Sequence, residues 1–68
     1  EVYSLMEQML AMHQPVDLLY DGTKIDQGVI KGRSFTHPDM ASYDIEVMKN
    51  DRSVIIANVP AKNVRLSV

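Results

Sequence analysis

The pattern of apolar and polar residues changes its period once along the chain, near Pro15. Before that point apolar side chains recur every three or four residues, at Val2, Leu5, Met6, Met9 and Leu10. This spacing is typical of one face of an amphipathic helix, and Ser4 with Glu7 matches a capping box. Proline cannot continue a helix, so the pattern predicts an N-terminal α-helix within residues 1–14. Its apolar face should cover an open end or face of the rest of the domain.

After Pro15 the pattern favours β-structure. Five segments read as strands, at Val16–Tyr20, Lys24–Arg33, Tyr43–Lys49, Ser53–Val59 and Asn63–Val68. Turn residues separate them, at Asp21-Gly22, His37-Pro38-Asp39, Asn50-Asp51 and Pro60-Ala61-Lys62. Gly28 and Gly32 inside the second strand indicate a bulge or a sharp bend. We therefore predict a single, mostly β domain over residues 1–68, with a small and strongly bent five-stranded barrel over residues 15–68.

The fourth predicted strand is apolar on both of its faces. Residues 54–57 and Val59 form a nearly continuous apolar run, which is expected of a strand that is covered on both sides. A domain of 68 residues has little material to cover it, and its first and last strands lack internal proline that would discourage edge pairing. The pattern therefore predicts a homo-oligomer.

Composition and charge narrow the functional classes. The chain has no cysteine, which excludes disulfides and thiolate metal sites, and no apolar run long enough to span a membrane. No signal-peptide pattern is present, so we expect a cytoplasmic protein. The net charge is −2, but residues 1–30 carry −4 and residues 31–68 carry +2. Any nucleic-acid surface should therefore lie in the second half, although ordinary solvated charge explains the asymmetry equally well.

Several features of the sequence together resemble the Sm/Sm-like (LSm) family, whose prokaryotic branch is Hfq. They are the stretch Pro15-Val16-Asp17-Leu18-Leu19-Tyr20-Asp21-Gly22, the second strand broken by Gly28, and the ending Val59-Pro60-Ala61-Lys62-Asn63-Val64-Arg65-Leu66. The resemblance covers nearly the whole chain. It implies an Sm-like, SH3-like barrel in which the fourth strand of one subunit pairs with the fifth strand of the next. It also implies a closed homo-oligomeric ring of about five to seven subunits that binds single-stranded RNA.

The resemblance also indicates where RNA would bind. In the family the site is built from the loop after the second strand and the turn before the fifth, which here are residues 34–39 and 60–63. The candidate RNA-binding residues are Arg33, Phe35, His37, Lys62 and Asn63. Phe35 and His37 could stack on unpaired bases. Equally, Phe35 could close the end of the barrel, and the commoner role for His37 is to open the turn before Pro38.

Catalysis, cofactors and metals have little support. Ser34, His37 and Asp39 lie too close together along one turn to form a preset triad, and the two histidines have no carboxylates at ligand spacing. We therefore expect an RNA chaperone or regulator that is not an enzyme and has no cofactor. The alternative is an SH3-like protein-interaction module or a structural ring without an RNA ligand, which the acidic net charge and the missing Arg-Gly dipeptide favour.

Overall fold

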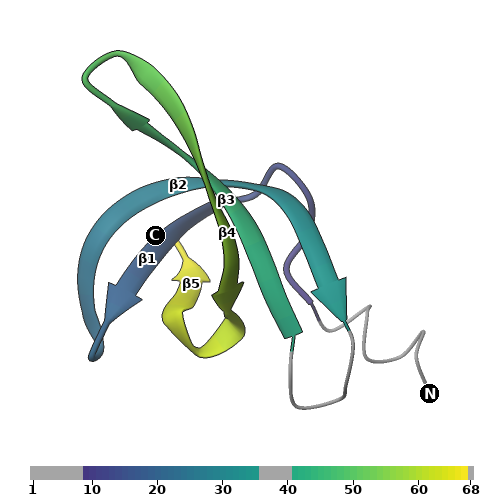
Figure 1. The fold of residues 1–68 in the computed structure, drawn as a ribbon. Helices are drawn as coiled ribbons and strands as arrows, with labels where there is room; N and C mark the ends of the chain where they lie inside the picture. Colours follow the sequence, from purple (N-terminus) through teal and green to yellow (C-terminus); the bar gives the residue numbers. More distant parts are fainter. Residues whose placement is uncertain (1–8, 36–40, 68) are drawn as a thin grey trace.

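The described residues form one antiparallel sheet of five strands. The structure is a computed structural model, and it describes residues 9–35 and 41–67. The strands are β1 (Pro15–Tyr20), β2 (Thr23–Phe35), β3 (Ala41–Lys49), β4 (Arg52–Pro60) and β5 (Val64–Leu66), with the 3-10 helix η1 (Ala61–Asn63) before β5. The order across the sheet is β4-β3-β2-β1-β5, so β4 and β5 are its two edges. The sheet curves strongly, and β2 forms a long arch over β1 and β5 (Figure 1).

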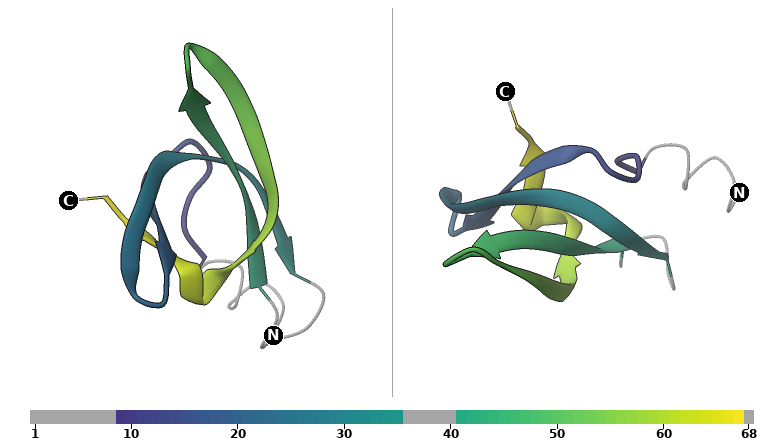
Figure 2. Two further views of the ribbon diagram at one scale, coloured as in Figure 1. Left: turned by 60° about the vertical axis from the view of Figure 1, so that its left-hand side comes forward. Right: turned by 90° about the horizontal axis from the view of Figure 1, so that it is seen from above.

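The mostly β prediction is confirmed, and its five strands recur with shifted ends. β2 and β3 each extend by one to three residues beyond their predicted ends, because they pair with each other as far as Phe35 and Ala41. The predicted fifth strand was too long, since β5 ends at Leu66. Seen from above, β1 and β5 lie on one side of the curved sheet, and β3 and β4 on the other (Figure 2).

The prediction of an N-terminal helix is wrong for residues 9–14, while residues 1–8 lie outside the described part. His13 has a φ of 64°, outside the right-handed helical region. The backbone N–H of His13 donates to the carbonyl oxygen of Ile30 at 2.7 Å, and the N–H of Ile30 donates to the carbonyl oxygen of Gln14 at 3.1 Å. The apolar residues Met9 and Leu10 still pack on the core, but from an extended stretch beside β2. Pairing with an available strand therefore overrides the helical periodicity at these positions.

The core lies inside the curve of the sheet. Its buried side chains come from every strand: Val16, Leu18, Ile30, Tyr43, Ile45, Val47, Val59 and Val64. Along β3 the buried residues alternate with half-buried polar ones, as the sequence pattern predicts. Alternation thus places one continuous apolar layer on the concave side.

Two turns and one glycine explain how so short a chain curves. Asp21 and Gly22 have φ of 50° and 78°, and Asn50 and Asp51 have φ of 51° and 64°, which are the positive values that tight hairpins require. At Gly28 a Cβ atom would collide with the backbone oxygen of Glu46 and with core methyl groups of β3. The expected close backbone approach at this glycine is confirmed, and β2 can bend there because no side chain intervenes.

Candidate nucleic-acid interface

The predicted site residues that the structure describes gather at one end of the sheet. β2 ends there at Phe35, β3 begins there at Ala41, and β4 ends there at Pro60, which leads into η1. The register places Ser34 opposite Ser42 and Ser42 opposite Pro60, so three strand ends lie side by side. We call this region, with Arg33, Phe35, Lys62 and Asn63, the loop end. His37 lies outside the described residues.

Each of these four side chains has a distinct environment. Arg33 is exposed on β2, and its Nη1 donates a hydrogen bond to the carbonyl oxygen of Leu10 at 3.3 Å. Phe35 is half-buried. Lys62 is exposed in η1, and Asn63 beside it is half-buried. The loop end therefore offers two cations, one aromatic ring with an accessible surface and one amide.

Sequence reasoning missed the residues that hold Arg33 in place. The buried Tyr43 lies opposite Arg33 in the register, and its Oη accepts a hydrogen bond from the backbone N–H of Leu10 at 2.9 Å. Arg33 and Tyr43 thereby bind the two polar groups of the same residue. The apolar period at Leu10 indicated burial, but no pattern indicated that its backbone would lie against Arg33.

The cations of the chain fall into two groups. Four of them form ion pairs, which are Lys24 and Arg65 with Asp17, Lys31 with Glu46, and Lys49 with Asp26. Within residues 9–35 and 41–67, no carboxylate forms an ion pair with Arg33, Lys62 or Arg52. Arg33 and Lys62 lie at the loop end, whereas Arg52 follows the hairpin turn at the opposite end of β3. Positive charge that is free of a described carboxylate is thus concentrated at the loop end.

The strongest electrostatic cluster lies away from this site, on the outer face of β1 and β5. Asp17 is 8% exposed at its side chain and lies 3.2 Å from Arg65 Nε and 3.3 Å from Lys24 Nζ. Burial alone would raise the pKa of Asp17, but the hydrogen bond from Arg65 and the nearby ammonium group of Lys24 outweigh it and lower that pKa below 3.8. Asp17 Oδ1 accepts no hydrogen bond from the described residues, so Lys24 acts on it through its charge. This cluster joins β5 to β1 and leaves no cation for a ligand.

Metals and membranes receive no support from the described residues. No three His, Asp or Glu side chains among them stand close enough to hold a metal ion. Nor does the described part of the chain contain a helix with the length and apolar character needed to cross a membrane.

Comparison with known proteins adds no relative: no family model, no curated protein and no solved structure matches the chain.

Proposed function

We propose that this protein binds single-stranded RNA at the loop end, as an Sm-like barrel that assembles into a homo-oligomeric ring of about five to seven copies. The observation that carries the proposal is the meeting of Arg33 and Lys62, neither paired with a described carboxylate, beside the accessible ring of Phe35. Cations that track phosphates, together with an aromatic platform for bases, are the two components of single-strand recognition. No catalysis and no cofactor is part of the proposal.

Assembly is supported by the two edges of the sheet. On β4 the exposed fractions of Val54, Ile55 and Ile56 are 43%, 51% and 38%, and on β5 that of Leu66 is 44%. Val54 and Ile56 lie opposite the buried Val47 and Ile45, so they face the core side and remain uncovered only because β4 is an edge. Pairing β4 of one copy with β5 of the next would bury these residues and repeat the loop end around the ring.

Fluorescence anisotropy with labelled U-rich and A-rich RNA oligomers tests the proposal. We expect Lys62→Ala to weaken binding and to flatten the dependence of log K on log salt by about 0.7, because one phosphate contact is lost per subunit. Arg52→Ala is the matched control, since Arg52 also lacks a described ionic partner but lies at the opposite end. Equal losses for the two variants would reduce the interaction to general charge, and no binding by the wild type would reject the function.

A second candidate is the protein-interaction module, which the exposed β4 edge favours. An edge strand of nine residues with apolar side chains on both faces can accept a strand from another protein. A protein that fails to bind RNA and remains monomeric in native mass spectra would make this candidate the leading one.

A further inference from the structure

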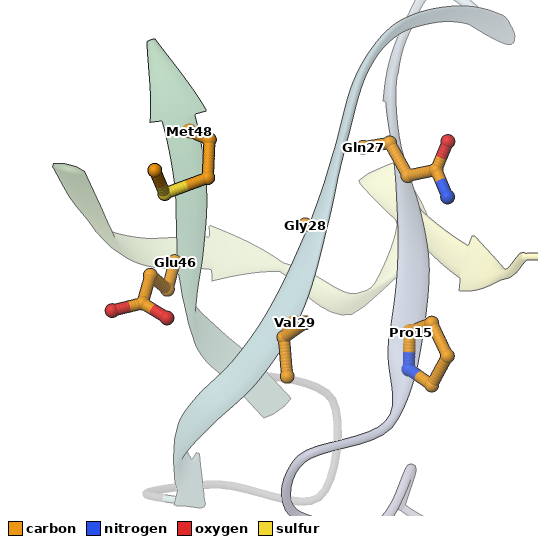
Figure 3. A pocket seen from close by; sticks show the side chains of 6 residues that line it. All are labelled: Pro15, Gln27, Gly28, Val29, Glu46 and Met48. Atoms are coloured by element: carbon orange, nitrogen blue, oxygen red, sulfur yellow. The ribbon is translucent and has the colours of Figure 1, made fainter. Parts of the chain in front are cut away.

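A groove lies on the outer face of β1, β2 and β3, away from the loop end and from both sheet edges. It is lined by Pro15, Gln27, Gly28, Val29, Glu46 and Met48 and encloses about 320 Å³. Figure 3 shows the side chains of β2 on either side of Gly28, with Met48 and Glu46 on β3 and Pro15 on β1 around them. The outward side chains before and after Gly28 diverge because β2 bends there, and this divergence opens the hollow.

The floor and one wall of the groove have no polar group to offer a ligand. Gly28 pairs with Val16 on one side and Val47 on the other, so its backbone belongs to the sheet. The amide of Gln27 is also engaged, because its Oε1 accepts from Lys24 at 3.1 Å and its Nε2 donates to Ser67 Oγ at 3.3 Å. Polar recognition in this groove therefore depends on Glu46.

Glu46 has one carboxylate oxygen with spare capacity. Its Oε2 accepts a hydrogen bond from Ser53 Oγ at 2.6 Å, whereas its Oε1 has only Lys31 Nζ at 3.8 Å, which is longer than a hydrogen bond. The carboxylate side chain is 33% exposed, so a better-placed cation can reach this oxygen. A phosphate would be repelled here, which excludes RNA from the groove.

The rest of the rim suits an aliphatic stem. Pro15 and Val29 lie opposite each other in the register, and Glu46 lies opposite Val29 on the other side. Met48, with an exposed fraction of 64%, is a flexible apolar side chain that adapts to different partners. Lysine and arginine have this form, because their methylene stems lie on apolar surface while their charged heads reach a carboxylate.

We propose that this groove binds a lysine or arginine side chain of a partner polypeptide, with the stem over Val29 and Met48 and the charged head at Glu46. A polypeptide is favoured over a free amine because the apolar surface continues past the groove. Ile55 on β4 lies opposite Glu46 and is 51% exposed, so it can receive a neighbouring apolar side chain of the same segment. The groove would let the protein hold a basic protein segment while the loop end holds RNA.

Nuclear magnetic resonance titration of the isotopically labelled full chain tests this inference. The probes are acetyl-Ala-Xaa-Ala amides in which Xaa is arginine, lysine or the uncharged norleucine. We expect arginine and lysine peptides to shift the amide signals of Gly28 and Val29 and the methyl signal of Met48, with affinity near the millimolar range. Norleucine should bind roughly two- to fivefold more weakly, since an exposed ion pair contributes modestly.

Variants make the test specific. Glu46→Gln should reduce arginine affinity roughly two- to fivefold, and Met48→Ser should weaken arginine and norleucine binding alike. Asp51→Asn, another exposed carboxylate on the β3–β4 turn, is the matched control and should change nothing. Unchanged affinity in Glu46→Gln, or an equal response to norleucine, would overturn the inference. An equal response to free n-butylammonium would identify an amine site and reject the polypeptide partner. RNA binding is measured separately and should survive Glu46→Gln, so the two proposals fail independently.

Discussion

The two edges of the sheet are protected in opposite ways. β5 has three residues, and the ion pair between Arg65 and Asp17 holds it against β1. β4 has nine residues, and between Ser53 and Pro60 it carries no charged side chain. Shortness and charge are two devices by which proteins prevent unwanted strand pairing. β5 uses both and β4 uses neither over most of its length, so the difference identifies β4 as the edge from which assembly would begin.

The largest effect should come from placing a charge on the unprotected edge. Ile56 faces the core side but is 38% exposed, so Ile56→Lys can keep its ammonium group in water in a single copy. At a contact between copies the same charge would be desolvated without a partner. We expect native mass spectra to change from an oligomer to a monomer that remains folded by circular dichroism. An unchanged oligomer would place the contact elsewhere.

A matched pair of valines compares the edges by stability. Val64 on β5 is 8% exposed and Val54 on β4 is 43% exposed, although both face the core side. We expect Val64→Ala to lower the free energy of unfolding by about 2 kcal/mol, through two lost methylene equivalents and a cavity. In the monomer Val54→Ala should cost less than about 1 kcal/mol.

The measurement is urea unfolding at several protein concentrations. If copies cover β4, the cost of Val54→Ala should rise with concentration and approach that of Val64→Ala. Equal costs at the lowest concentration would show that a single copy already covers β4.

The smallest effect concerns the ionic attachment of β5 and its dependence on pH. Although burial opposes it, the hydrogen bond from Arg65 and the charge of Lys24 lower the pKa of Asp17, and hydrogen bonding to Lys49 lowers the pKa of Asp26. A carboxylate whose pKa is lower in the folded state stabilises the fold above its ordinary value of 3.8. That contribution is lost as the pH falls through the lower folded value.

We therefore expect thermal stability to fall below about pH 4, and Asp17→Asn to start lower at pH 7 and to lose less on acidification. The control Asp26→Asn changes the other ion pair and leaves β5 attached. Hydrogen exchange of the Ser67 amide, which donates to the carbonyl oxygen of Pro15 at 3.2 Å, should accelerate in Asp17→Asn only. Equal exchange in both variants would contradict the role assigned to Asp17.

Local chemistry explains which predictions succeeded. The hairpin at Asp21-Gly22 and the close approach at Gly28 depend on backbone preferences of residues adjacent in the chain, so they could be recognised directly. The helical period before Pro15 failed for Met9 and Leu10, because their apolar side chains find the core equally well from an extended chain. Residues 36–40, with the candidate His37, stay a prediction.

The sequence by itself determined the strand-rich class, the order and approximate ends of the strands, the tight turns and the apolar face of each strand. These properties depend on side-chain period and turn chemistry, which act between near neighbours. The tertiary structure alone decided which strands became edges, which cations were neutralised and that Tyr43 and Arg33 would hold Leu10. Those outcomes depend on pairings between residues far apart in the chain, such as Asp17 with Arg65, and a local pattern carries no information about them.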